Sequence, residues 1–88
     1  MRIVWDEPKR RANFDKHGLD FSDLTVDFFL AAILRPARLG RLMAIGRFAD
    51  GTIAVIFARL GHEGIAIISM RPARKSERRL LHDLEEED

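Results

Sequence analysis

Five cationic side chains stand within nine residues near the C-terminus: Arg71, Arg74, Lys75, Arg78 and Arg79. Guanidinium groups match phosphate oxygens in pairs, because their N–H donors form a planar fork. A strand that leads into a helix at this point would add free backbone amides, which also favour anions. The cluster therefore predicts a phosphate site. The alternative is a solvated surface whose arginines pair with the acidic residues of the C-terminus.

Metal-free cleavage of RNA would need more than cations. The 2′-hydroxyl attacks the adjacent phosphate, so one group takes its proton, cations stabilise the phosphate oxygens and an acid protonates the leaving oxygen. His17 is the best candidate for either proton transfer, because an imidazole titrates near neutral pH. Alternatively, its charge stabilises the end of a helix. Glu77 is a second candidate base, or else it orients an arginine or pairs with a neighbour along a helix.

A second set of candidate residues lies near the N-terminus. Lys9, Asn13 and Lys16 follow one another at helical spacing, which puts them in a stripe on one helix face. The stripe predicts contacts with an RNA backbone, and the alternative is a solvated face without a function. The candidate catalytic set is His17, Lys16, Arg71, Glu77 and Arg78, and the candidate RNA-binding set is Lys9, Asn13, Arg74, Lys75 and Arg79.

The sequence indicates neither a metal site nor a cofactor site. The chain has no cysteine, and His17, His62 and His82 are scattered without the spacing of paired metal ligands. We therefore expect any RNA cleavage to survive a chelator.

Charge is distributed unevenly along the chain. The formal net charge is +1, and the last six residues contribute five negative charges, so residues 1–82 carry +6. A basic body suits a polyanion such as RNA.

The 88 residues predict one domain with an acidic tail at about 83–88. No apolar run is long enough to span a membrane, and the N-terminus does not resemble a signal peptide, so we expect a cytoplasmic protein.

The elements that must position these side chains indicate an α+β fold. A short strand over residues 2–5 precedes a helix that begins after Asp6 as N-cap and ends at about His17, before Gly18. Residues 41–48, 52–60 and 65–70 predict a three-stranded antiparallel meander, with a hairpin turn at Asp50-Gly51. A last helix should cover roughly 74–84 and fray beyond it, because its acidic residues oppose the macrodipole.

A second helix is predicted between Asp20 or Ser22 and Pro36. Its apolar residues occupy most of the circumference: Leu24, Val26, Phe28, Phe29, Leu30 and Ile33. An 88-residue domain has little interior to cover them all. We therefore expect some of them to form an exposed interface for a partner, and we expect an acidic partner surface to approach the 71–79 cluster. The first helix, in contrast, has Phe14 as its only large apolar residue, which should pin it to the body.

Two motifs together resemble the BrnT family of bacterial toxins. Residues 5–18 follow the family's opening pattern W-D-x-x-K-x-x-x-N-x-x-K-H-G, and His17 falls on its histidine. Residues 67–71 read I-I-S-M-R, similar to the family's I-I-S-A-R, and the following helix carries the family's E-R pair at Glu77-Arg78. The resemblance implies a RelE-like fold, a metal-independent ribonuclease activity and a BrnA-like antitoxin as partner. It leaves open whether the chain forms a homodimer or a heterotetramer with the antitoxin.

Several positions depart from the family pattern. Leu39 stands where the family has a glutamate before Arg41, Ala66 stands where it often has an arginine, and Arg74 replaces a threonine before the last helix. These departures keep a second hypothesis open: a catalytically degenerate binding module that pairs with an antitoxin and acts in promoter autoregulation. A third is a nucleic-acid-binding domain without a partner.

Overall fold

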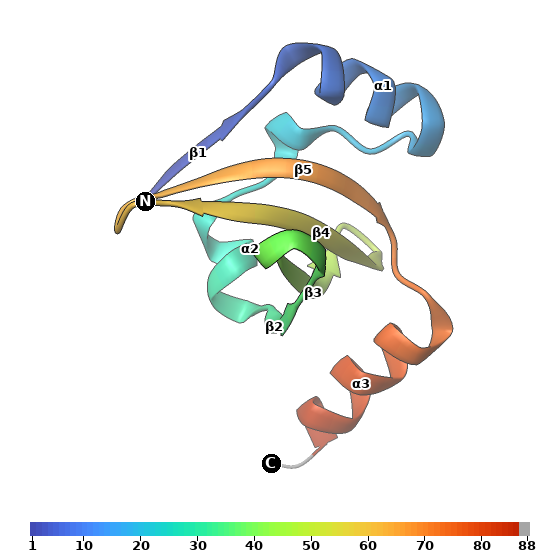
Figure 1. The fold of residues 1–88 in the computed structure, drawn as a ribbon. Coiled ribbons are helices and arrows are strands. Elements are labelled where there is room, and N and C mark those ends of the chain that lie inside the picture. The colour runs from blue at the N-terminus through green and yellow to red at the C-terminus, as the bar shows by residue number, and fades with distance from the viewer. Residues whose placement is uncertain (87–88) are drawn as a thin grey trace.

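The computed structural model describes residues 1–86. Along the chain the elements are β1 (Arg2–Trp5), α1 (Glu7–His17), η1 (Phe21–Asp23), α2 (Val26–Ala31), β2 (Ile33–Pro36), η2 (Arg38–Gly40), β3 (Leu42–Phe48), β4 (Gly51–Leu60), β5 (Gly64–Pro72) and α3 (Lys75–Glu86). Figure 1 shows them arranged around one twisted sheet, with α1 and α3 at opposite ends of it.

The sheet has five strands in the order β1-β5-β4-β3-β2. Strands β2 to β5 pair antiparallel, and β1 pairs parallel with β5. The predicted meander of three antiparallel strands is confirmed as β3, β4 and β5. The α+β class and the helix after the meander are confirmed as well. Of the two outer strands, β1 was predicted and β2 was not.

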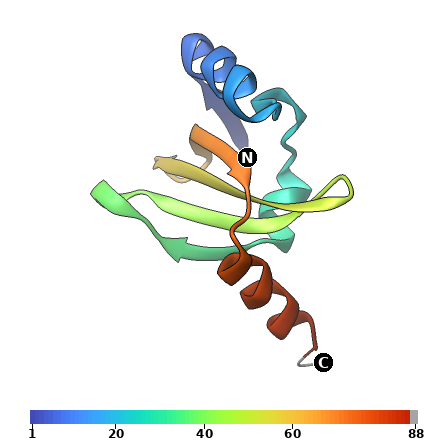
Figure 2. The ribbon, with the colours of Figure 1, turned by 90° about the vertical axis from the view of Figure 1, so that its right-hand side faces the viewer.

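Alternation along the strands gives the sheet two different faces. The first face carries the core: Ala44, Ile53, Val55, Phe57, Ile65, Ile67 and Met70, covered by Phe21 of η1, by Leu24 and by Phe28 of α2. Gly46 allows α2 to approach closely, because a Cβ there would lie 2.9 Å from a ring carbon of Phe28. The second face holds Ile45, Ala54 and Arg71 at paired positions. Helix α3 leaves β5 toward this face and contacts β3 (Figure 2).

The predicted second helix is correct only in its middle, because residues 21–23 form the separate 3-10 turn η1 and the chain leaves the helix after Ala31. Helix α2 covers only Val26–Ala31, after Thr25, whose hydroxyl accepts the backbone N–H of Phe28 at 3.3 Å. The chain then turns extended at Ala32 and continues as β2, which pairs with β3. Pairing with β3 holds residues 33–36 extended, and Pro36 adds to this by disfavouring the helical conformation of Arg35. Apolar residues assigned to one helix are therefore divided between a helix and a strand.

Helix α1 is attached to the sheet by Asn13, while Phe14 is 48% exposed and does not pin it. β1 pairs with β5 only as far as Ile67. Further along, the Asn13 carboxamide takes the place of a neighbouring strand: its Nδ2 donates to the carbonyl of Met70 at 2.8 Å, and its Oδ1 accepts the N–H of Met70 at 3.0 Å. Nδ2 also donates to the carbonyl of Leu19 at 3.2 Å. The prediction of Asn13 as an RNA contact is therefore corrected, since its side chain is buried and occupied.

The predicted helix ends agree with the structure at α1. The side chain of Asp6 accepts the backbone N–H of Lys9, and Gly18 has the left-handed conformation with φ 70°. Helix α3 runs to Glu86, two residues beyond the expected end, and Glu87 and Asp88 of the predicted acidic tail lie outside the described residues. No helix in residues 1–86 is long and apolar enough to cross a membrane.

Candidate functional site

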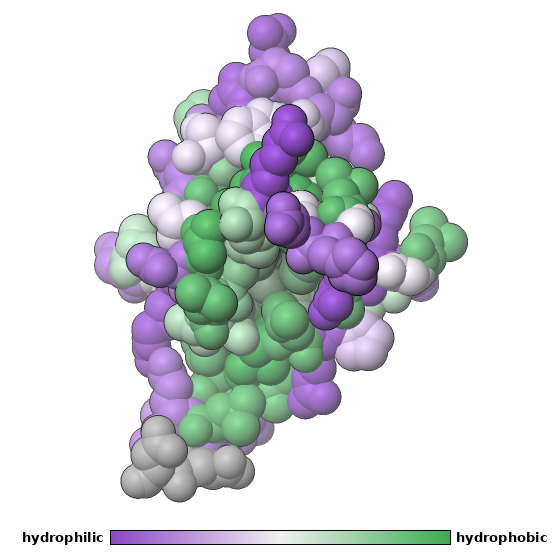
Figure 3. Space-filling model, turned by 90° about the vertical axis from the view of Figure 1, so that its left-hand side faces the viewer, coloured by the Kyte–Doolittle hydropathy of each residue, from purple (hydrophilic) through white to green (hydrophobic). Residues whose placement is uncertain are grey.

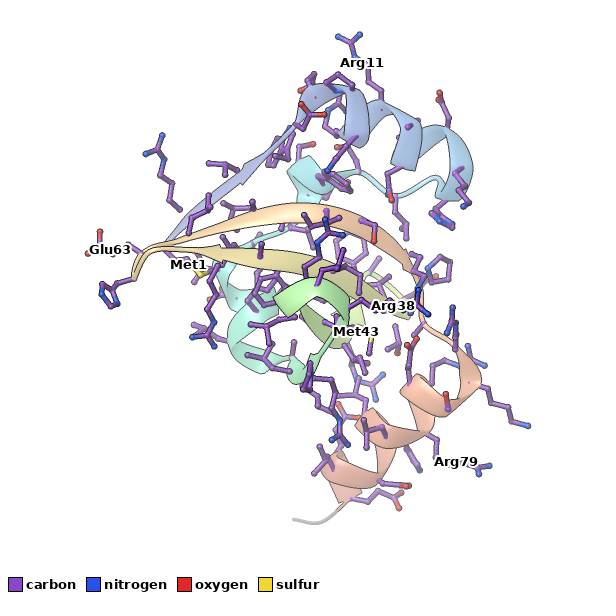
Figure 4. All side chains as sticks on the ribbon, in the orientation of Figure 1. Met1, Arg11, Arg38, Met43, Glu63 and Arg79 are labelled. Atoms are coloured by element: carbon purple, nitrogen blue, oxygen red, sulfur yellow. The ribbon has the colours of Figure 1, made fainter. Side chains whose placement is uncertain are left out.

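An open groove on the second face of the sheet brings arginines together from three parts of the chain. It lies between the β2–β3 connection and the beginning of α3. Its lining residues are Pro36, Ala37, Arg38, Arg41, Met43, Ile56, Ile68, Ser69, Arg71, Arg74 and Glu77. We call it the arginine groove. Figure 4 labels two of these lining residues, Arg38 and Met43.

Strand register builds the floor of the arginine groove. Met43, Ile56 and Ser69 are direct partners across β3, β4 and β5. A register shift follows Ile56, so β5 has Ile68 as an extra residue at this point. Such irregularities often occur beside functional sites, because they change the direction of side chains. The result is a mostly apolar floor with one hydroxyl, that of Ser69.

One wall is organised by Glu77. Its carboxylate accepts two hydrogen bonds from the Arg71 guanidinium, at 2.7 and 2.9 Å, and a third from the backbone N–H of Arg74 at 2.7 Å. The hydrogen bonds from Arg71 are the main reason that the pKa of Glu77 lies below its usual value, and the Arg74 amide lowers it further. The pKa of Arg71 is raised in turn. Glu77 is therefore held between Arg71 and the start of α3, which suits it to orienting Arg71, and its lowered pKa makes it a weaker proton acceptor.

The opposite wall comes from Arg38 and Arg41, which sequence reasoning did not assign to the site. A tight turn joins β2 to β3, and the backbone N–H of Arg41 donates to the carbonyl of Arg38 at 3.1 Å. The turn puts both side chains at the groove, across from Arg71 and Arg74. The sequence signal for these two residues is weak: Arg35, Arg38 and Arg41 recur at regular spacing, but the spacing alone does not bring them to Arg71.

Of the predicted site residues, Arg71, Arg74 and Glu77 line the arginine groove. Lys16 and His17 lie in the last turn of α1, outside the groove lining, so the structure does not bring them into one groove with Arg71 and Glu77. The Arg78 guanidinium donates to the carbonyl of Ala73 at 2.8 Å, which ties the start of α3 to the end of β5.

The remaining predicted RNA contacts lie outside the groove as well. Lys9 is exposed on α1, and Lys75 and Arg79 are exposed on α3. In Figure 4 the Arg79 side chain extends away from the sheet. These side chains can extend a basic surface, but they do not converge on one point.

The arrangement is suited to a phosphate group. Four arginines face one carboxylate, so the lining has an excess of three positive charges. Among residues 1–86, salt bridges within this lining are confined to Arg71 and Glu77. The same part of the chain assembles no group of three or more metal-ligand side chains. The arginines that line the two walls therefore give the groove the charge and the guanidinium donors that a phosphate group favours.

Comparisons with known proteins agree with the resemblance seen in the two sequence motifs. The family model described as the ribonuclease toxin BrnT of type II toxin–antitoxin systems matches residues 5–77. The crystal structure of the Brucella abortus ribonuclease toxin BrnT is similar to this chain, with 54% identity, coverage of 85% of this chain and 99% of that chain, and a TM-score of 0.80. No match is found among curated proteins. The chain belongs to the BrnT family, and it is a ribonuclease toxin of a type II toxin–antitoxin system.

Proposed function

We propose that the arginine groove is where this toxin binds and cleaves RNA, and that it does so without a metal ion. The observation that carries the proposal is the convergence of Arg38, Arg41, Arg71 and Arg74 on one open groove. Guanidinium groups in a partly apolar site stabilise a negatively charged transition state more strongly than they would in water. The scissile phosphate binds between the two walls.

The proposed reaction is an internal transfer at phosphorus. The 2′-oxygen bonds to the adjacent phosphorus and loses its proton to solvent, the bond from phosphorus to the 5′-oxygen breaks, and that oxygen takes a proton from solvent. The products are a 2′,3′-cyclic phosphate and a free 5′-hydroxyl. The arginines neutralise the charge that builds on the phosphate oxygens in the transition state. Glu77 acts as a positioning residue that holds Arg71.

Cleavage of a single-stranded RNA by two arginine variants tests this assignment. Arg41→Ala should lower the cleavage rate by about 100-fold, the loss typical for removal of one group that stabilises a transition-state oxyanion. Arg59→Ala is the matched control, because Arg59 is exposed and lies outside the groove lining. Cleavage by the unmodified toxin should persist in EDTA. Full activity of Arg41→Ala, or activity that EDTA abolishes and magnesium restores, would contradict the proposal.

The toxin–antitoxin family implies an antitoxin partner, and we propose that it is BrnA-like and docks on an apolar hollow at the other end of β5. The hollow is lined by Met1, Phe29, Leu30, Leu34, Phe57 and Ile65, with Arg59 in its wall. Leu30 is 78% exposed. Apolar side chains gather over the middle and lower part of the face drawn in Figure 3. Large apolar patches on small domains mark interfaces, so this surface fits the expected partner.

Strand β2 connects the apolar hollow to the arginine groove. Leu34 lines the hollow, and Pro36, two residues later, lines the groove. A partner seated on the hollow can therefore place acidic residues against Arg38 and Arg41 and compete with RNA by charge. Both the proposed substrate and this partner are cytoplasmic molecules, so we place the toxin in the cytoplasm.

Titration of the antitoxin into toxin variants tests the docking surface. Leu30→Asp should weaken binding by at least about tenfold, because it puts a charge into an apolar contact. Phe14→Asp is the control, since Phe14 is also exposed but lies on α1. If Leu30→Asp leaves antitoxin binding unchanged, or alters only self-association of the toxin, the assignment is wrong.

A further inference from the structure

The turn between β2 and β3 holds a leucine where turn chemistry does not favour one. Leu39 has φ 59° and ψ 35°, and Gly40 has φ 72°. With the hydrogen bond from the Arg41 N–H to the Arg38 carbonyl at 3.1 Å, residues 38–41 form a tight β-turn with positive φ at both central positions. Such turns favour Asn-Gly or Asp-Gly, because a side chain with an ordinary Cβ is strained in the left-handed region. Folding therefore does not account for the leucine.

The same leucine is also the most exposed of the large apolar side chains, at 86%. The turn projects from the body of the sheet as the green tip in Figure 2. Two unfavourable features thus meet in one residue, a strained backbone and an apolar side chain in water. Backbone strain of this kind is concentrated at functional sites, where the surroundings maintain it.

Leu39 lies between two arginines of the arginine groove. Arg38 precedes it and Arg41 follows two residues later, and both line the groove. Leu39 itself lies just outside the groove lining. Consecutive Cα atoms are about 3.8 Å apart, so the nucleotides that flank a phosphate held by these arginines come within reach of the leucine. The bases of a single strand have apolar faces that bind apolar side chains, and proteins insert leucine between bases in this way.

We propose that Leu39 is a nucleobase contact of this toxin. Its side chain packs against the base next to the phosphate held by the arginine groove, and so helps to select unpaired RNA. The proposal rests on the groove as the RNA site. Leu39 contributes to substrate binding, whereas the arginines stabilise the transition state.

The decisive variant is Leu39→Asn, which creates the favoured Asn-Gly turn. We expect its melting temperature to be unchanged or higher, because asparagine tolerates the left-handed conformation. On a single-stranded oligoribonucleotide, KM should rise about tenfold with little change in kcat, since the value of one base contact is of this order. Leu39→Met should keep KM within about twofold, as it retains an apolar side chain of similar volume.

Two modified substrates show whether the contact that Leu39→Asn removes is a contact to a base. The cleaved position is mapped on the oligoribonucleotide, and an abasic residue then replaces the nucleotide on either side of it. On one of these substrates, Leu39→Asn and the unmodified toxin should have the same KM, because the contact is missing in both. Leu60→Asn is the control, since Leu60 is exposed at the far end of β4.

Three results would overturn the proposal. One is an unchanged KM for Leu39→Asn on the intact RNA, and another is a rise in KM that persists on both abasic substrates. The third is weaker antitoxin binding with an unchanged KM, which would assign Leu39 to the partner. If Arg41→Ala also keeps full activity, the groove itself is not the RNA site. If Arg41→Ala is inactive while Leu39→Asn is normal, only the assignment of Leu39 fails.

Discussion

Glu77 holds Arg71 with both of its carboxylate oxygens, at 2.7 and 2.9 Å, and the same carboxylate accepts the backbone N–H of Arg74, the residue before α3. One side chain thus positions an arginine of the groove and stabilises the start of the helix that follows. Both partners are largely buried, with 21% of the Arg71 side chain and 10% of the Glu77 side chain exposed. The pair therefore couples the local stability of this junction to the geometry of the proposed phosphate site.

Glu77→Gln tests the positioning role. The amide can still accept one hydrogen bond, but it leaves Arg71 without its carboxylate, so we expect a loss of about 1–3 kcal/mol in the free energy of unfolding. Cleavage should slow by about tenfold, because a disordered guanidinium stabilises the transition state less well. The pH profile of cleavage should keep its shape, whereas loss of a titrating limb would mark Glu77 as a base. Glu85→Gln, which affects only the exposed pair with Arg47, is the control.

Acid should remove the contribution of Glu77 to stability. Its pKa in the folded protein lies below the ordinary value of 4.5 because of the hydrogen bonds from Arg71 and Arg74. A carboxyl group with a lowered folded pKa stabilises the protein above the unfolded pKa and loses that effect as the pH falls through the folded pKa. Urea unfolding of the unmodified toxin and Glu77→Gln should differ at pH 7, and the difference should shrink below about pH 4.5. A difference that is the same at pH 7 and pH 3 would contradict this.

Asn13→Ala should destabilise the fold without a direct effect on RNA binding. It removes three hydrogen bonds to the backbone of Met70 and Leu19, and it leaves buried backbone groups of Met70 unpaired. We expect a loss of about 2–3 kcal/mol, measured by urea unfolding. Lys9→Ala, an exposed change on the same helix, should have little effect. If Asn13→Ala is as stable as the unmodified toxin but binds RNA weakly, Asn13 is an RNA contact, as the sequence predicts.

Variants of His17 and Arg71 distinguish two mechanisms, proton transfer by the histidine and charge stabilisation by the groove arginines. If the groove arginines carry the reaction, His17→Ala should reduce cleavage by less than about tenfold and Arg71→Ala by about 100-fold. The physical reason is position, since Arg71 lines the groove and His17 lies outside its lining. Single-turnover cleavage at saturating enzyme measures both. A larger loss for His17→Ala than for Arg71→Ala would restore the histidine as the proton-transfer group.

Local features of this protein were readable in its sequence. The N-cap at Asp6, the left-handed Gly18 and the three strands of the meander follow from residue types and spacings over a few positions. The cationic cluster and the family motif also indicate Arg71 and Glu77 as candidate site residues. These features depend on neighbours within one element or one turn, so a linear pattern is sufficient to predict them.

The tertiary structure decided what depends on partners far apart in the chain. β2 became a strand because Ile33–Pro36 pairs with β3, a contact that overrides the helical spacing of its apolar residues. Asn13 has a structural role because its carboxamide hydrogen-bonds the backbone of Met70, 57 residues later, at a strand edge that no neighbouring strand within residues 1–86 pairs. Arg38 and Arg41 line one groove with Arg71 only because the sheet places β3 and β5 on either side of β4. Strand pairing across the sheet sets these distances, and no spacing along the sequence encodes them.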